Sequence, residues 1–207
     1  MTRRGRRPAR ISGDDRQDAI LSAAERLLAG RALDDISIEE FAHGAGISRS
    51  NFYFYFRSKD EMLLALLDRV IAEVDHRVAA LPRDFDRDPA EAWRRSIGVF
   101  VEVFAEHRAV STAAIAARVR SPEVLALWTE AMQTWVDYST EVIAAERARG
   151  AAPDGIASAD LAVTLNLMNE RVLSTTFGSE KLAVNQEAVL DVLATIWVRS
   201  IYGASIS

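Results

Sequence analysis

The sequence contains no cysteine, and this absence excludes several classes of function. Without cysteine among its 207 residues, the chain has no disulfides, no thiolate catalysis and no metal sites built on cysteine. No apolar run is long enough to span a bilayer, and no signal peptide precedes the first predicted helix. We therefore expect a cytoplasmic protein that does not contact a membrane.

Catalytic motifs are lacking as well. The three histidines, His43, His76 and His107, stand far apart and show no HxxxH-like spacing. No GxSxG, P-loop or GxGxxG pattern occurs, so the usual sequence signals for a nucleophile, a phosphate cradle or a dinucleotide site are missing. We expect neither an enzyme nor a metal or cofactor.

The charge is unevenly distributed along the chain. The formal net charge is −5, which is unusual for a nucleic-acid-binding protein. Residues 1–70, however, carry 12 basic and 11 acidic residues, against 13 and 19 in residues 71–207. Residues 1–13 hold five arginines and no acid, a composition typical of an arm that binds phosphates or a minor groove. The alternative is a solvated terminus.

A helix start is encoded around Ser37. Glu40 follows three residues later, and Ile36 is matched by Phe41. This pattern is a capping box inside a hydrophobic staple, and it predicts a helix that begins at Ile38. With 49% hydrophobic residues, the chain can bury such a helix in a core.

A second short helix follows at once. Residues 44–46 (Gly-Ala-Gly) predict the end of the first helix, since glycine adopts the left-handed turn conformation. Ser48 is a good N-cap, and Ile47 is spaced to pack on Phe52. Two short helices joined by a glycine turn predict a helix-turn-helix, whose second helix enters the major groove of DNA.

The second helix carries suitable chemistry. Phe52 and Phe56 face inward by helical spacing, so polar residues face outward. Arginine and asparagine read base edges, serine and tyrosine hydroxyls hold phosphates, and N–H groups at the two helix starts attract anions. The candidate DNA-binding residues are Ser37, Ser48, Arg49, Ser50, Asn51, Tyr53, Tyr55 and Lys59. The alternative is a helical hairpin with an aromatic core and no ligand.

Further helices flank this unit. We predict a first helix over residues 14–29 and a long helix that starts with a capping box at Ser58–Glu61 and ends near residue 80. In its first turn, Lys59 is either a phosphate contact or a solvated lysine. Residues 81–89 read as a loop. Further predicted helices start at Ser121-Pro122 and end at Gly150, span 158–177, and span about 185–202.

Aromatic residues recur at helical spacing in the second half. Tryptophan is large and its N–H needs a partner, so two facing stripes of such residues predict a long apolar channel rather than a tight core. The stripes comprise Trp93, Phe100, Trp128, Trp135 and Trp197. Asn166 and Asn169 share a helix face in an apolar run, either as polar groups of this channel or as buried amides satisfied by neighbouring backbone.

The segment GISRSNFYFYFRSKDEML resembles the recognition helix and following residues of TetR-type transcriptional regulators. The segments AWRRSIGVFVEVFAEHRAV, LNLMNER and IWVRSIYG resemble one branch of that family, in which a long hydrophobic ligand occupies an aromatic channel. Matched by position, the resemblance implies a ligand site at Trp93, Phe100, Phe104, Met132, Trp135, Tyr138, Asn166, Asn169, Glu170, Leu173 and Trp197. Ala92, Ser96 and Ser139 depart from the pattern of that branch, which implies an altered shape at one end.

The combined prediction is an all-α protein of about nine helices. Residues 1–13 form a basic arm, 14–68 a three-helix bundle with the helix-turn-helix, and 69–207 a helical ligand-binding and dimerisation domain. The family implies a homodimer through the last two helices, which are apolar on two sides. The expected partners are double-stranded operator DNA and a hydrophobic effector that releases the repressor from DNA. The alternatives are a ligand carrier with a vestigial helix-turn-helix, an activator, or a repressor of an efflux pump rather than of a monooxygenase.

Overall fold

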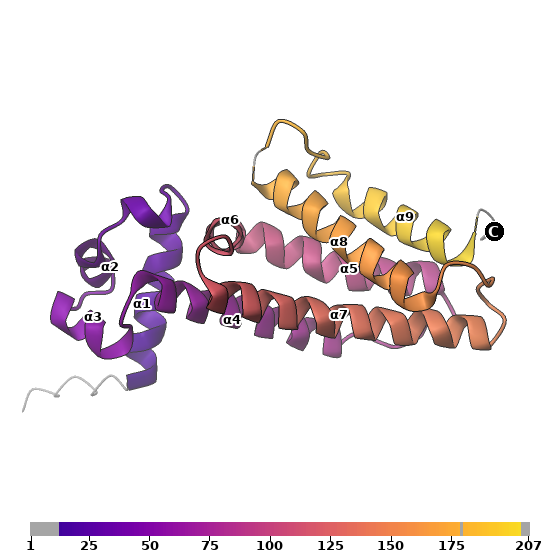
Figure 1. Cartoon of the computed structure of the whole chain (residues 1–207), viewed down its shortest axis with the longest axis horizontal. Helices are drawn as coiled ribbons and strands as arrows, with labels where there is room; N and C mark the ends of the chain where they lie inside the picture. The colour runs from indigo at the N-terminus through magenta and orange to yellow at the C-terminus, as the bar shows by residue number, and fades with distance from the viewer. Residues whose placement is uncertain (1–12, 179, 204–207) are drawn as a thin grey trace, which may run out of the picture.

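The computed structural model describes residues 13–178 and 180–203, and within them it contains helices and no strand. The predicted all-α class is therefore confirmed. The N-terminal basic arm, except for Gly13, lies outside the described residues. Helices α1 to α3 and the start of α4 form one end of the molecule, and the remaining helices form an elongated bundle beside them (Figure 1). The helices are α1 (Gly13–Leu28), η1 (Leu33–Asp35), α2 (Ile38–Gly44), α3 (Arg49–Tyr55), α4 (Lys59–Ala79), α5 (Pro89–Glu106), α6 (Arg108–Ala117), α7 (Pro122–Ala148), α8 (Ser158–Phe177) and α9 (Val189–Tyr202).

The helix-turn-helix begins where its caps predict. The Glu40 N–H donates to Ser37 Oγ (3.2 Å), and the Ser37 N–H donates to Glu40 Oε2 (2.8 Å), which completes the capping box of α2. Gly46 turns the chain with φ of 69°, in the region that favours glycine. The Asn51 N–H then donates to Ser48 Oγ (3.2 Å) at the start of α3.

The N-terminal bundle, which we define as α1–α3 with the first turns of α4, has its own buried side chains. Ile20, Phe41 and Phe52 are fully buried, as are Ile36 and Met62. These residues come from α1, α2, α3, the segment before α2 and α4. They continue without a break into the core of the larger helical part, so α4 belongs to both.

The start of α4 differs from the prediction in two respects. Ser58 Oγ accepts from the Glu61 N–H (3.0 Å), but the Glu61 carboxylate accepts from the Arg57 N–H (2.6 Å) instead of returning to Ser58. The predicted capping box is thus only half formed. Lys59 is neither solvated nor free for a phosphate, because its Nζ donates to the carbonyls of Leu33 (2.9 Å), Asp34 (3.2 Å) and Ile36 (3.0 Å).

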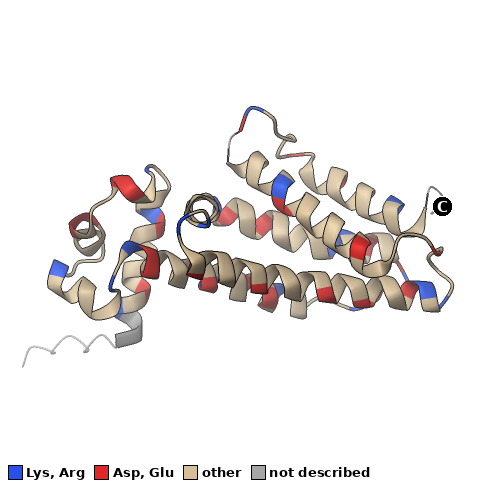
Figure 2. Cartoon of the chain, in the orientation of Figure 1, with Lys and Arg blue, Asp and Glu red and all other residues tan. Residues whose placement is uncertain are grey.

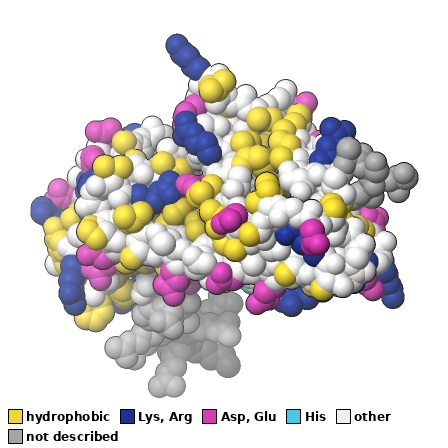
Figure 3. All heavy atoms as spheres, turned by 45° about the vertical axis from the view of Figure 1, so that its right-hand side comes forward, with side chains coloured by type: hydrophobic (Ala, Val, Ile, Leu, Met, Phe, Trp, Pro, Cys, Tyr) yellow, Lys and Arg dark blue, Asp and Glu magenta, His cyan; other side chains and the backbone are white. Residues whose placement is uncertain are grey.

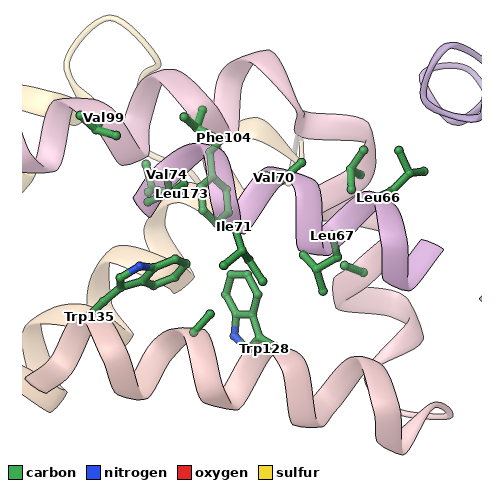
Figure 4. Close-up of a cluster of buried hydrophobic side chains, with 14 of the residues drawn as sticks. Leu66, Leu67, Val70, Ile71, Val74, Val99, Phe104, Trp128, Trp135 and Leu173 are labelled. Atoms are coloured by element: carbon green, nitrogen blue, oxygen red, sulfur yellow. The ribbon is translucent and has the colours of Figure 1, made fainter. Parts of the chain in front are cut away.

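In the larger helical part, α4 lies between α5 and α7. Figure 4 shows the side chains of α4 between Phe104 of α5 and Trp128 of α7, with Ile71 pointing toward Trp128. Leu66 and Val74 of α4 are also buried in this cluster. Helix α4 therefore packs against both the N-terminal bundle and the larger helical part over a length of about 30 Å for 21 residues.

One expectation about the C-terminal helices was wrong. The last helix starts at Val189 rather than near residue 185, because Asn185 Oδ1 accepts from the Glu187 N–H (2.9 Å) and holds a turn there. No helix of the described residues is long and apolar enough to cross a membrane.

Candidate DNA-binding helix and ligand cavity

Helix α3 presents its polar residues to solvent. The Arg49 side chain is 58% exposed and lies 3.6 Å from a carboxylate oxygen of Glu39 on α2. Its guanidinium also lies 5.9 Å from the centre of the Tyr53 ring. Tyr53, and to a lesser extent Glu39, raises the pKa of Arg49. The guanidinium is thus permanently charged and held on the outer side of the helix.

The other predicted DNA-binding residues fall into two groups. Ser50 and Asn51 are exposed, and Tyr53 is 44% exposed, so all three are accessible to DNA. Ser37 and Ser48 serve as helix caps, and Tyr55 is half-buried against the core. Basic and acidic residues both occur on the ribbon at this end of the molecule (Figure 2).

The capping box at Ser37 makes the N-terminal bundle sensitive to acid. Hydrogen bonds from Arg31 and then from Ser37 lower the pKa of Glu40 from 4.5 to about 2. A carboxyl group with a lowered folded-state pKa stabilises the fold above its unfolded-state pKa, and this contribution is lost as the pH falls from about 4.5 to about 2.

We expect Glu40→Gln to remove part of this acid dependence. The measurement is the urea midpoint of the variant and of the parent chain at pH 5 and at pH 3. The matched control is Glu39→Gln, which makes the same charge change in the same helical turn without a capping bond. Equal acid sensitivity of Glu40→Gln and the parent would contradict the prediction.

The larger helical part contains a mostly apolar cavity of about 320 Å³ that is partly open to solvent. Residues from α4, α5, α7, α8 and α9 surround it, which makes it a cavity between helices of a bundle, a common place for a ligand. Its aromatic walls are Trp93, Phe100, Trp135, Tyr138 and Trp197, and its polar groups include Asp75, Arg83, Ser96, Ser139, Asn166 and Asn169.

Each tryptophan N–H at this cavity has a partner. Trp197 donates to Asn169 Oδ1 (2.9 Å), and Trp135 donates to Asp75 Oδ1 (2.9 Å). Trp93 donates to the hydroxyl of Tyr202 (3.2 Å). The rings are thus held in position, and the cavity is a preformed space rather than a loosely packed core.

The two asparagines leave one donor and one acceptor group for a ligand. Asn166 Nδ2 donates to Ser139 Oγ (3.2 Å) and to the carbonyl of Ala162 (2.9 Å). Among the described residues, no hydrogen bond uses Asn166 Oδ1 or Asn169 Nδ2. Both residues line the cavity. An acceptor beside a donor on an apolar wall matches the two polar groups of a secondary amide.

A second, almost filled cavity of about 10 Å³ adjoins the first. Phe100 and Trp135 line both spaces, and their rings meet edge to face with centres 5.0 Å apart. The walls of the second space include Phe104, Trp128, Met132, Glu170 and Leu173. Together, the two cavities are lined by all eleven residues that the resemblance implied, although none is thereby shown to bind a ligand.

Ion pairs connect the second cavity with the N-terminal bundle through the turn between α6 and α7. Glu170 is paired with Arg118 (2.7 Å), whose guanidinium lies 5.0 Å from the Trp128 ring. Two residues further on, Arg120 contacts Asp34 (3.3 Å) and Asp60 (3.6 Å). The turn between α6 and α7 therefore contacts both the cavity wall and the N-terminal bundle.

Sequence reasoning missed part of the site. Asp75 and Arg83 line the 320 Å³ cavity, but they lie on α4 and on the loop after it, and neither segment was predicted to contribute to the channel. The spacing of Val74 and Val78 on α4 was a usable signal for a face turned toward the bundle. The buried carboxylate of Glu146 was also missed. It accepts hydrogen bonds from Arg149 (2.6 Å) and from the hydroxyl of Tyr202 (2.8 Å), to which Trp93 donates.

The structure also brings histidine and carboxylates together where the sequence had separated them. His107 lies 2.5 Å from Glu25 and 3.1 Å from Glu73, and Glu73, Glu106 and His107 have ligand atoms close enough for a metal ion. Arg77, however, is paired with both Glu73 and Glu106 (2.6 Å to Glu106). The guanidinium satisfies these carboxylates, so the cluster is a network of ion pairs that joins α1, α4 and α5.

Helices α8 and α9 leave apolar side chains exposed. Val163 and Leu167 on α8 are 41% and 51% exposed, and Val192 and Ile196 on α9 are 36% and 38% exposed. Val189 and Leu193 of α9 are fully buried within the chain. Hydrophobic side chains form a patch in the upper part of the face in Figure 3, on the side where Figure 1 places α8 and α9.

Comparison with known proteins gives matches to both parts of the chain. Residues 20–66 match the family described as bacterial regulatory proteins of the tetR family, and residues 93–203 match the C-terminal domain of transcriptional regulator EthR. The chain is 53% identical to the HTH-type transcriptional regulator EthR of Mycobacterium tuberculosis H37Rv, covering 97% of this chain and 93% of the relative. It is 46% identical to EthR of Mycolicibacterium smegmatis, covering 98% and 93%.

Solved structures share the fold at low sequence identity. A transcriptional regulator from Saccharomonospora viridis, in complex with choline, has a TM-score of 0.75 and 18% identity over 90% of this chain and 96% of its own. NalD, the secondary repressor of the MexAB-OprM multidrug efflux pump in Pseudomonas aeruginosa, has a TM-score of 0.73 and 16% identity over 94% and 100%. These similarities show the fold alone.

Proposed function

The chain belongs to the TetR family of helix-turn-helix transcriptional regulators and resembles EthR, and from this premise we propose that it is a dimeric repressor released from operator DNA by a hydrophobic ligand. The observation that carries the proposal is the position of α4. This helix begins beside α3 with Lys59 bound to three carbonyls, and it ends with Asp75, Val78 and Ala79 in the cavity wall. A ligand in the cavity therefore contacts the helix that carries the N-terminal bundle.

The ligand class follows from the cavity walls. Five aromatic rings and few polar groups favour a long apolar molecule. The unused Asn166 Oδ1 and Asn169 Nδ2 favour an amide within it, and an ester uses only the donor. The ligand acts on DNA binding only if it binds the released arrangement of the two N-terminal bundles more tightly than the DNA-bound one.

The dimer is supported by the exposed apolar residues of α8 and α9. Val163 and Leu167 are four residues apart on one helix, and Val192 and Ile196 are four apart on the other, so each pair forms a stripe. A two-fold pairing of these stripes would bury them and would present two α3 helices to successive major grooves.

A gel shift tests the proposal. The DNA upstream of the chain's own gene and of its neighbour is titrated with protein at fixed salt, since salt strongly changes such affinities. N-hexyloctanamide is then added, with acetamide as the control compound that has the amide and no long chain. We expect a shift that N-hexyloctanamide reverses and acetamide does not. N-hexyloctanamide must weaken the binding of DNA by the same factor by which DNA weakens the binding of N-hexyloctanamide.

The other outcomes separate the alternatives. A shift that the amide leaves unchanged would keep the DNA-binding regulator and reject the cavity as the effector site. Amide binding with no shift of either fragment, even at low salt, would favour the carrier. The identity of the gene behind the shifted fragment distinguishes control of a monooxygenase from control of an efflux pump.

A further inference from the structure

Phe54 is the most exposed aromatic residue of the described part of the chain. It is 83% exposed, whereas Phe52 and Phe56 on the same segment are 0% and 3% exposed. At 3.6 residues per turn, Phe54 points about 160° away from Phe52. It therefore lies at the centre of the face of α3 that is turned away from the protein.

The fold makes little use of this ring. Its aromatic neighbour is Tyr55, edge to face at 5.3 Å between ring centres, and this contact leaves most of the ring in solvent. Single exposed apolar residues are common on protein surfaces. Val119 and Leu182, at 93% and 88% exposed, are of this kind and lie between helices. Phe54 differs because it projects from the helix that the family fold presents to DNA.

The chemistry of phenylalanine limits what Phe54 can contact there. The ring has no donor or acceptor for a phosphate or for the polar edge of a base. In the major groove, the C5-methyl group of thymine is the apolar feature that distinguishes one base pair from another, and phenylalanine is among the side chains that contact it. Exposed Ser50 and Asn51 on the same helix can bond neighbouring bases.

We propose that Phe54 is a specificity-determining residue that reads thymine methyl groups in the operator. The inference rests on the proposed function, since it requires that α3 enters the major groove. Arg49 and Asn51 then supply polar contacts, and Phe54 selects thymine over cytosine by an apolar contact alone. Specificity of this kind depends on one methyl group and not on a hydrogen bond, so it can be tested by removing that methyl.

The test is a methyl-deletion scan. The shifted fragment is footprinted, and the protected site is synthesised with each thymine in turn replaced by uracil, which lacks the C5-methyl and keeps the same hydrogen-bonding edge. The full-length chain and Phe54→Ala are titrated against each duplex at fixed salt. For the parent chain we expect uracil to weaken binding about fourfold at one or more positions, comparable to losing one buried methylene group.

For Phe54→Ala we expect affinity for the unmodified site to fall about tenfold, as when part of a buried aromatic contact is lost, and the uracil penalty at those positions to disappear. Phe54→Leu, which keeps an apolar side chain, should retain part of the penalty. Leu182→Ala is the matched control, since it removes another exposed apolar side chain away from α3, and its penalties should equal those of the parent.

Three results would overturn the inference. The first is a uracil penalty that persists unchanged in Phe54→Ala. The second is Phe54→Ala binding as tightly as the parent. The third is a parent chain that shows no uracil penalty at any position. A parent chain that shifts no DNA refutes the proposed function and this inference together, whereas the first three outcomes leave the proposed function intact.

Discussion

Replacing Phe52 by alanine is expected to destabilise the N-terminal bundle severely and to abolish binding to any operator fragment. Phe52 is fully buried, and its ring packs against Phe56 with centres 5.8 Å apart. Removing such a side chain costs about 3–5 kcal/mol, a large part of the roughly 5–15 kcal/mol that stabilises a typical protein. Because α3 has only seven residues, it depends on this packing rather than on intrinsic helix stability.

Urea unfolding followed by circular dichroism measures the expected loss, and the gel shift measures its consequence. Phe54→Ala is a close control for the unfolding measurement alone, since it deletes the same side chain two positions away at a site that is 83% exposed. That variant should unfold at the same urea concentration as the parent. A Phe52→Ala chain with unchanged unfolding would show that the ring is not the core of the bundle.

The helix-turn-helix was predictable because its signals are local. Ser37 and Ser48 each accept a hydrogen bond from a backbone N–H three residues later, so the cap and its partner are both visible in a short stretch of sequence. Gly46 adopts the positive φ that its position requires. Hence α2 and α3 begin at the predicted residues, and their inward face is the predicted one.

Contacts between distant residues were not predictable in this way. Lys59 was predicted as a phosphate contact because its position near α3 was visible in the sequence and its partners were not. Those partners are the carbonyls of Leu33, Asp34 and Ile36, which are backbone groups that any residue could supply. Asp75 lines the cavity only because α4 is rotated toward α7, where Trp135 donates to it. Nothing in the residues around either side chain specifies that orientation.

The residues of the candidate ligand site could be predicted only in part. The stripes of aromatic residues predicted that a cavity would form, since large rings with N–H groups cannot be packed repeatedly without gaps or partners. The stripes did not predict that the rings of Phe100 and Trp135 would meet edge to face where the two cavities adjoin. This contact depends on side-chain rotamers on two helices, and it bears on the length of ligand that fits.

Replacing Trp135 by alanine is expected to join the two cavities and to shift the ligand preference toward longer chains. The Trp135 and Phe100 side chains line both spaces, as do Asn166 and Asn169, and the two rings meet edge to face. Its removal should destabilise the chain by about 3–5 kcal/mol, since a buried ring is lost and a cavity remains. A ligand that occupies the combined space restores part of this stability in proportion to the logarithm of its concentration over its Kd.

The measurement is the thermal unfolding midpoint in the presence of neutral N-alkyl amides of rising chain length. We expect the chain length that gives the greatest stabilisation to be longer for Trp135→Ala than for the parent. Ile143→Ala is the matched control, because Ile143 is fully buried on the same helix and lines neither cavity. It should lose a comparable stability, about 2–5 kcal/mol, and keep the parent's preference. The same optimum in all three proteins would mean that Trp135 does not limit the length of the ligand, and that the inner space is part of the hydrophobic core.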